Sequence, residues 1–264
     1  MCLLVVRWQP DEDYPLVVGA NRDERLDRPA TALAVLAPVD PRILGGRDHL
    51  AGGTWLAVNE HGVVAGLTNQ PSVGGRDPSR RSRGELPLQL ARAPSAAAAV
   101  DALVGSVRPG DYNPVWLVVG DRRDLFFVDL GREPGPGADR LAAGLHVMEN
   151  RALGIPSAKV DQVVGSVTGA TAHGEDLWSV LPRVLADHTL PVDRADEIEL
   201  PRPPGSAERP PGIRAACVHT DGYGTRSSTL VRVPASKGHR PDVKVASGPP
   251  CTTAFVDAGA LWGS

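Results

Sequence analysis

The sequence predicts a layered α+β fold in which antiparallel sheets and helices form a single domain. Apolar runs bounded by turn residues gather towards both ends of the chain, and an alanine-rich helical segment lies in the middle. Neighbouring runs are joined by short connections, which favours antiparallel pairing because parallel strands need long crossovers. No internal repeat or clear linker divides the 264 residues, so we expect one domain over residues 1–264.

The N-terminal part predicts two hairpins. Residues 3–6 and 16–18 are apolar runs joined by a polar, proline-bounded loop at 9–15. Residues 55–58 and 63–69 form the clearest hairpin of the sequence, with turn residues between them. A glycine- and arginine-rich stretch at 74–84 follows, which we interpret as a loop, with a lid as the alternative.

The rest of the chain alternates helical and strand-like patterns. Residues 86–107 predict two helices separated at Pro94, with Ser95 capping the second one, and further helices are expected at 156–164 and 174–187. Apolar strands covered on both faces are expected at 115–119 and 125–128, and further strands at 144–148, at 214–220 paired with 228–233, and at an edge at 253–256. Residues 189–212 predict a long proline-rich loop or flap, and residues 237–250 predict an irregular stretch.

Composition restricts the classes of partner. The net charge is −3, from 28 basic and 31 acidic residues, which gives no electrostatic case for nucleic acid or an anionic membrane. No apolar run approaches the ~20 residues of a membrane span, and no signal-peptide pattern is present. The three cysteines are widely spaced and lack a CxxC motif, so we expect no disulfide framework, no metal site and no cofactor, in a reducing, cytoplasmic location. A homo-oligomer stays open.

Cys2 follows the initiator methionine and begins the first apolar strand. Cysteine is small enough for Met1 to be removed by N-terminal processing, which would place an α-amine and a thiol on one residue. The amine could then accept the thiol proton, so that one residue supplies both a base and a nucleophile. The alternative is an ordinary cysteine at the start of a buried strand.

Polar side chains of the kinds that acyl transfer requires lie at predicted strand ends. A carboxylate can hold an N-terminal amine, an amide can donate to a developing oxyanion, and an arginine can steady a thiolate or bind a substrate carboxylate. Since strand ends converge in a sheet, we expect these groups to meet near Cys2. The candidates are Asn21, Arg22, Asp23, Glu24, Asn69, Asn150 and Arg226.

Several motifs together resemble the NRDE family, whose eukaryotic members are called transport and Golgi organisation proteins. The resemblance spans roughly residues 2–233, and the residues that carry it are Cys2, Asn21-Arg22-Asp23-Glu24, Gly53-Thr54-Trp55-Leu56, Leu67-Thr68-Asn69, Ser82-Arg83-Gly84 and Tyr223-Gly224-Thr225-Arg226. This family is similar to N-terminal nucleophile (Ntn) hydrolases with a leading cysteine, such as penicillin V acylase and bile salt hydrolase. The resemblance implies a four-layer αββα sandwich with two antiparallel sheets.

The resemblance also implies roles for single residues. Cys2 matches the nucleophile, and Asp23 matches the aspartate that orients the N-terminus. Asn69, or in second place Thr68, falls near the oxyanion asparagine, while Asn150 and Arg226 match a second asparagine and a late arginine. Two departures stand out. Arg22 is shifted relative to the arginine of the hydrolases, and Glu149 stands before Asn150 where family members often have a serine. Substrate contacts are expected from Asn21, Arg22, Glu24, Trp55 and Thr68.

These observations support two classes of function. The first is a cysteine Ntn amidohydrolase or acyltransferase that acts on an amide-type C–N bond of a small molecule. The second is a non-catalytic haem or lipid carrier, in which Cys2 or His146 would bind the haem iron. Met148, two residues after His146, could also touch the haem, and core packing is the alternative for His146 and Met148. A structural relic without a ligand is a third reading.

Overall fold

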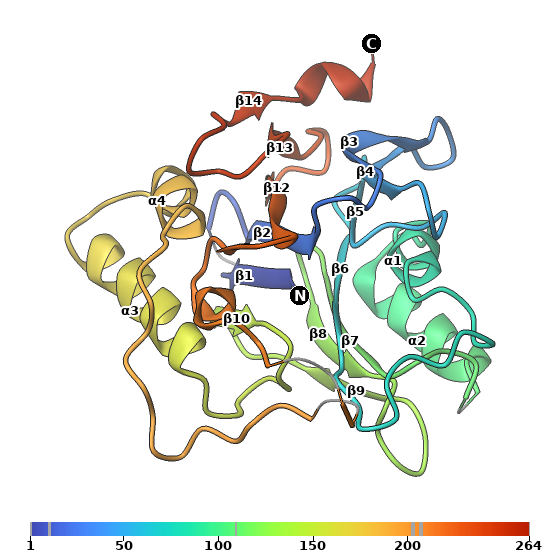
Figure 1. The fold of residues 1–264 in the computed structure, drawn as a ribbon. Coiled ribbons are helices and arrows are strands. Elements are labelled where there is room, and N and C mark those ends of the chain that lie inside the picture. The colour runs from blue at the N-terminus through green and yellow to red at the C-terminus, as the bar shows by residue number, and fades with distance from the viewer. Residues whose placement is uncertain (1, 10–11, 109, 202–203, 206–207, 264) are drawn as a thin grey trace.

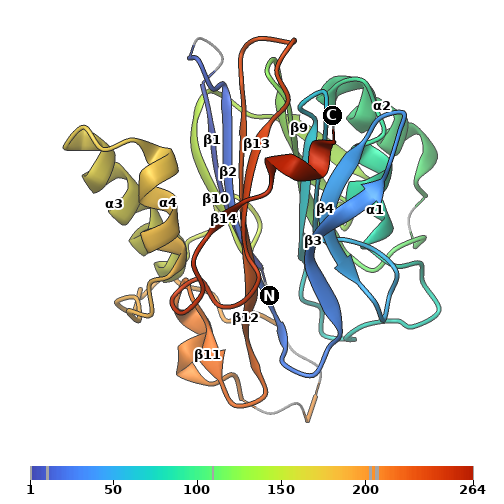
Figure 2. The same ribbon diagram turned by 90° about the horizontal axis from the view of Figure 1, so that it is seen from above.

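Two antiparallel β-sheets pack face to face between two pairs of helices, as the computed structural model of the chain shows (Figures 1 and 2). The structure describes residues 2–9, 12–108, 110–201, 204–205 and 208–263. Met1, parts of the predicted loop at 9–15 and parts of the predicted flap at 189–212 lie outside the described residues. The layers follow the order helix, sheet, sheet, helix, which confirms the αββα sandwich.

The first sheet, sheet A, contains the first and the last strand of the described chain. Its central strands β1, β2 and β12 are neighbours, so the N-terminal hairpin pairs with a strand about 200 residues later in the sequence. In spatial order the strands are β10 (Gly144–Met148), β1 (Cys2–Trp8), β2 (Leu16–Arg25), β12 (Tyr223–Val233), β13 (Asp242–Ala246) and β14 (Val256–Asp257), with the short β11 (His219–Thr220) also paired to β12.

The second sheet, sheet B, is a meander in which each strand pairs with the next one along the chain. Within it, β7 is buried along its whole length, as its continuous apolar sequence predicts. The strands are β3 (Ala30–Ala37), β4 (Ile43–Asp48), β5 (Leu56–Asn59), β6 (Val64–Asn69), β7 (Val115–Gly120), β8 (Leu125–Asp129) and β9 (Gly137–Arg140).

Helices cover the outer face of each sheet. On sheet B lie α1 (Glu85–Leu90) and α2 (Ala96–Ser106), and the Ser95 side chain accepts a hydrogen bond from the Ala98 amide as the predicted N-cap. On sheet A lie α3 (Ala158–Ala172), which is longer than predicted, and α4 (Leu177–Leu185). Two short 3₁₀ helices, η1 (Pro211–Arg214) and η2 (Gly259–Trp262), complete the elements described.

Apolar side chains fill every interface of the sandwich. Between the sheets pack residues such as Leu4, Trp116 and Met148, while Leu3 and Leu181 pack between sheet A and its helices. Burial of a side chain of this size stabilises the fold by about 1.5–3 kcal/mol. No helix in the described ranges is long and apolar enough to cross a bilayer.

The prediction of an irregular stretch at 237–250 is wrong, because β13 lies within it. In β13 the buried Val243 and Val245 alternate with the half-exposed Asp242 and Lys244. This period of two is typical of a strand near a sheet edge. The strand has only five residues, and the glycine and prolines around it indicated an irregular segment instead.

Two glycines bring the loop before β5 into backbone contact with the loop before α1. The Thr54 amide donates to the Gly84 carbonyl at 2.9 Å, and a Cβ on Gly53 would lie 2.4 Å from the Gly84 backbone. Two of the motifs that carry the family resemblance therefore meet here through their backbones, an approach that only glycine permits.

Replacing Gly53 by alanine should destabilise the protein by about 1–3 kcal/mol, because the added methyl group forces two backbones apart. Chemical denaturation measures the change in the free energy of unfolding. Gly74→Ala is the matched control, since a Cβ there meets no atom within 4 Å, and it should change stability by less than ~0.5 kcal/mol. Equal effects of the two substitutions would contradict the role given to Gly53.

Candidate active site

The register of β1 and β2 places Cys2 directly opposite Arg22. Directly opposite residues of an antiparallel pair point to the same face, and successive residues alternate. Cys2 is half-buried and packs against the core between the sheets, so Arg22 also faces that space. Asn21 and Asp23, which alternate with Arg22, face the helix-covered side of sheet A.

The start of β1 lies at the end of β6. At the far end of β1 the Trp8 indole donates to the Asp121 carbonyl, just beyond β7, and in the middle a Cβ on Gly66 would lie 3.1 Å from Leu4. Strands β1 and β6 are in contact. Two residues before Leu4 on β1 is Cys2, and two residues after Gly66 on β6 is Thr68, so Cys2 and Thr68 lie at the same end of the two strands. Thr68 points to the same face of sheet B as Gly66, because the two are separated by two residues.

Four buried polar atoms near this end of the sheets have no hydrogen-bond partner in the described part of the chain. They belong to residues on both sheets, and Thr68 and Trp116 are cross-strand neighbours. Unsatisfied buried groups are rare in folded proteins, and they are costly unless a ligand or water completes them. The atoms are Arg22 Nη1, Thr68 Oγ1, Trp116 Nε1 and Asn150 Oδ1.

Arg22 is held by an aromatic ring and a carboxylate. Its guanidinium lies 4.3 Å from the centre of the Trp55 ring, and Nη2 lies 3.3 Å from Asp48 Oδ2. Gly46 makes room for this stack, because a Cβ there would lie 1.9 Å from the Trp55 ring. Burial lowers the pKa of Arg22, and the nearby Cys2 opposes that shift. Arg22 thus brings a fixed positive charge next to the thiol.

Asp23 is buried beside the N-terminal end of the chain. Its Oδ1 accepts a hydrogen bond from the Thr225 hydroxyl at 2.6 Å. Burial raises the pKa of this carboxyl, whereas Lys159 and the positive charge of the N-terminus lower it. A carboxylate that interacts with the N-terminal charge has the position expected of a group that orients an α-amine.

The Cys2 thiol has a raised pKa. Burial is the main cause and the negative charge of Asp23 adds to it, while the N-terminal charge and Arg22 act in the opposite direction. At neutral pH the sulfur is therefore mainly a neutral thiol, which needs a neighbouring base before it can attack.

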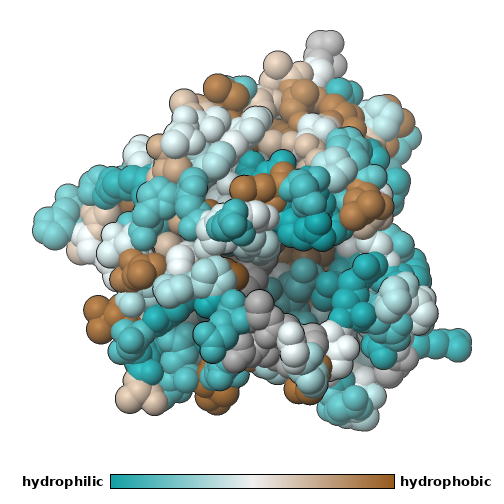
Figure 3. Space-filling model, viewed as in Figure 1, coloured by the Kyte–Doolittle hydropathy of each residue, from teal (hydrophilic) through white to brown (hydrophobic). Residues whose placement is uncertain are grey.

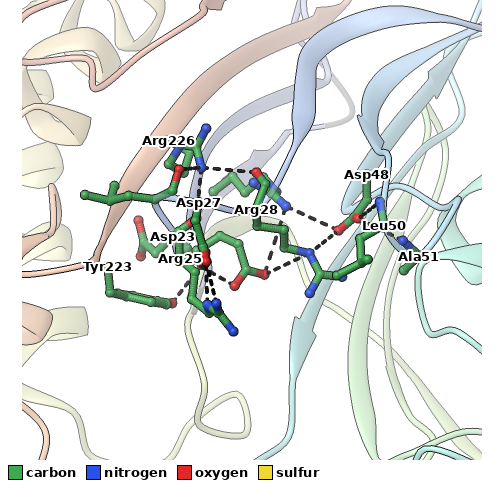
Figure 4. Close-up of polar contacts among 12 residues, drawn as sticks. Asp23, Arg25, Asp27, Arg28, Asp48, Leu50, Ala51, Tyr223 and Arg226 are labelled. Carbon is green, nitrogen blue, oxygen red and sulfur yellow. Dashed lines mark hydrogen bonds and ion pairs between the residues drawn. The ribbon is translucent and has the colours of Figure 1, made fainter.

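Asn21 and Arg226 contact backbone carbonyls and do not converge on Cys2. Asn21 Nδ2 donates to the Leu185 and Ala216 carbonyls at 2.8 and 2.9 Å. Arg226 Nη1 donates to three carbonyls of the turn after β2, those of residues 25, 26 and 28 (Figure 4). These contacts tie β2 to its surroundings, and the predicted substrate and catalytic roles of the two residues stay predictions.

The predicted asparagines lie next to each other at the end of β6. Asn150 Nδ2 donates to the Asn69 carbonyl at 2.5 Å, and the Asn69 side chain is exposed. Glu149, which stands where family members often have a serine, lies 3.3 Å from Arg151 and accepts a hydrogen bond from the Ser157 hydroxyl at 2.5 Å. Its charge is therefore balanced within the fold.

Glu24 lies on the same face of β2 as Arg22. Its carboxylate lies 3.6 Å from Arg28 and 4.0 Å from Arg22. It also lines a cavity of about 150 Å³ that reaches Trp55, Asn69 and several arginines. Glu24 and Trp55 therefore line the same cavity, and their predicted substrate contacts stay predictions.

Arginines of the loop before α1 line this cavity and a neighbouring one of about 240 Å³. Arg76 and Arg83 border both, together with Asn69. Burial and the charge of Arg76 lower the pKa of Arg83 to about 10. The face of the molecule that surrounds the N-terminus is largely hydrophilic (Figure 3). The sequence signalled these residues only through the arginine-rich composition of 74–84.

His146 and Met148 lie in β10. Met148 is 1% exposed and packs in the core between the sheets, while the His146 ring bonds to the Ala142 carbonyl at 2.9 Å. Both side chains therefore make the contacts of ordinary packing and hydrogen bonding.

The profile of the family Transport and Golgi organisation 2 matches residues 1–240. The chain belongs to this family. It is 31% identical over 263 residues to the Transport and Golgi organization protein 2 homolog of Bos taurus and 30% identical over 271 residues to that of Homo sapiens, each comparison covering 90% of both chains.

A solved structure shares the fold. The N-acylethanolamine-hydrolyzing acid amidase ortholog of Caenorhabditis elegans superposes with a TM-score of 0.55 and 13% identity, covering 89% of this chain and 94% of that one. At this identity the likeness concerns the fold alone, and it agrees with the four-layer architecture that the motif resemblance implied.

Alkylation of Cys2 by iodoacetamide should rise with pH through a midpoint above the ~8.5 of a free cysteine, because burial raises its pKa. Peptide mass spectrometry resolves Cys2 from the other two cysteines. Arg22→Gln should move the midpoint upwards and Asp23→Asn should move it downwards, since the two charges act on the thiol in opposite senses. Shifts of the same sign in variants with a native circular dichroism spectrum would contradict this arrangement.

Proposed function

We propose that this chain is a cysteine Ntn hydrolase or acyltransferase that acts on an amide-type C–N bond of a small molecule. Cys2 would be the nucleophile after removal of Met1. The observation that carries the proposal is the position of Cys2 opposite Arg22, within reach of the charge of Asp23, at the end of the sandwich where buried polar atoms lack partners among the described residues. The amidase named among the structural neighbours supports the reaction type.

The first half-reaction would form a thioester. The α-amine of Cys2 takes the thiol proton, and the sulfur attacks the acyl carbon. The resulting oxyanion would accept hydrogen bonds from Thr68, Trp116 or the amides of Asn69 and Asn150. When the C–N bond breaks, the α-ammonium returns the proton to the leaving amine. Asp23 would hold the α-amine in position throughout.

The second half-reaction would regenerate the thiol. Water attacks the thioester carbon while the α-amine accepts a proton from it. The C–S bond then breaks, the sulfur regains a proton, and a carboxylic acid leaves. If an amine replaces water, the same step transfers the acyl group, which is why acyl transfer belongs to the proposal.

The cavities next to Asn69 would favour a substrate with a negative charge. Arg76 and Arg83 bring two positive charges to the same walls, and the depressed pKa of Arg83 reflects burial and that proximity. In the described residues Arg83 donates only to a backbone carbonyl, that of Pro114. A carboxylate or a similar anion on the substrate could pair with these guanidinium groups and offset part of their charge.

Cys2→Ser should abolish thioester formation and lower the rate of amide hydrolysis by about 10³-fold or more, because a serine hydroxyl is a poorer nucleophile in a site built for a thiol. Intact-mass spectrometry after treatment with an activated acyl ester reads the adduct and the loss of Met1 together. Arg92→Gln, which alters an exposed residue outside both cavities, is the control that should retain the Cys2 adduct. A native wild-type chain that keeps Met1 and stays unmodified at Cys2 would exclude the proposal.

Arg76→Gln should raise KM for an anionic acyl substrate by about tenfold, equivalent to a loss of about 1.4 kcal/mol, and leave KM for its neutral isostere unchanged. Steady-state kinetics on the matched pair of substrates gives both values. Arg92→Gln, an exposed arginine outside both cavities, serves as the control. A loss that is equal for both substrates would remove the charge argument and leave the reaction type intact.

A further inference from the structure

Two histidines and two cysteines from three distant segments meet beside β11, the short strand of sheet A. His188 follows α4, Cys217 and His219 flank the start of β11, and Cys251 lies in the loop between β13 and β14. Each residue offers one ligand atom, and the four atoms lie within 4.8 Å of one another. Two imidazoles and two thiols form a donor set that zinc prefers in structural sites.

The distances within the cluster match the edges of a zinc tetrahedron. With Zn–S of ~2.3 Å and Zn–N of ~2.0–2.1 Å, a sulfur and a nitrogen bound to one tetrahedral ion lie ~3.5 Å apart. His219 Nε2 lies 3.6 Å from Cys217 Sγ and 3.2 Å from Cys251 Sγ. The side chains are therefore already close to a coordinating arrangement.

A hydrogen bond fixes which nitrogen of His188 is available. Its Nδ1 lies 3.1 Å from the Cys217 carbonyl, which can only accept, so Nδ1 carries the proton. Nε2 is left with a free lone pair. Metal-binding histidines commonly donate their other ring N–H to a carbonyl in this way, which orients the ring towards the ion.

We propose that His188, Cys217, His219 and Cys251 bind one Zn²⁺ ion in a closed, four-coordinate structural site. All four positions would be filled by protein, so the ion would have no place for a substrate. A cation at this position would stabilise the cysteine thiolates and release protons on binding.

The site would stabilise the segment that supports Asp23. Val218, between the two ligands Cys217 and His219, donates its amide to Thr225 Oγ1 at 2.8 Å. The same Thr225 hydroxyl donates to Asp23 at 2.6 Å. Zinc would tie this segment to the end of α4 and to the C-terminal loop, so it would order one wall of the candidate active site without entering its chemistry.

The full-length protein, purified with a reductant, should bind one equivalent of zinc per chain in elemental analysis after gel filtration. Cobalt in place of zinc should give a thiolate-to-metal charge-transfer band and the visible absorption of tetrahedral Co²⁺. A chelator should lower the melting temperature of the wild-type chain. Cys251→Ser and His188→Gln should each weaken zinc binding by about 100-fold in competition with a chromophoric chelator.

Two controls separate this site from other groups. Cys2→Ser should keep full zinc content, so failure of the proposed catalytic function would leave this inference standing. His173→Gln alters an exposed histidine at the end of α3 and should also bind zinc normally. Zinc-free wild-type protein after incubation with zinc, equal binding by wild type and ligand variants, or a Cys217–Cys251 disulfide formed in place of metal binding would each overturn the proposal.

Discussion

The pairing register of β1 and β2 is the constraint on which the candidate site depends. A shift by one residue would turn Cys2 away from Arg22 and exchange the two faces of the strand. Apolar pattern alone does not fix this register, because β1 is buried on both faces. Polar contacts fix it, since Asn21 bonds to carbonyls on the helix side and Arg22 stacks on Trp55 on the opposite side. A shifted register would leave both groups buried without partners, at a cost of several kcal/mol.

Many of the residues that carry the family resemblance act through the backbone. Gly53 and Gly84 allow two loops to touch, and Arg226 holds the turn after β2 by its carbonyls. Thr225 links the β11 segment to Asp23. The motifs therefore combine a small number of chemical groups with the geometry that keeps them together.

Local sequence patterns predicted the hairpins and a helix cap, but they do not indicate contacts between segments that are distant in the sequence. The Ser95 cap and the β5–β6 hairpin depend on residues a few positions apart, and both are present. Thr225 and Asp23 meet across about 200 residues, and no spacing rule indicates that contact. The cluster at Cys217 and Cys251 has no CxxC spacing and was missed for the same reason. The motif resemblance, by contrast, identified the four-layer fold because it uses information from the whole chain.

The electrostatics around Cys2 favour one way of generating the nucleophile. In cysteine enzymes with a thiolate–imidazolium pair, a cation lowers the thiol pKa and the sulfur is charged before substrate arrives. Here burial and Asp23 together outweigh the N-terminal charge and Arg22, so the pKa of the thiol is raised and the thiol stays neutral at pH 7. A neutral thiol must lose its proton during attack, which requires a base within reach. The same Asp23 that disfavours the thiolate interacts with the positive charge of the N-terminus. An α-amine held there would satisfy the requirement, and the carboxylate would stabilise the ammonium that forms.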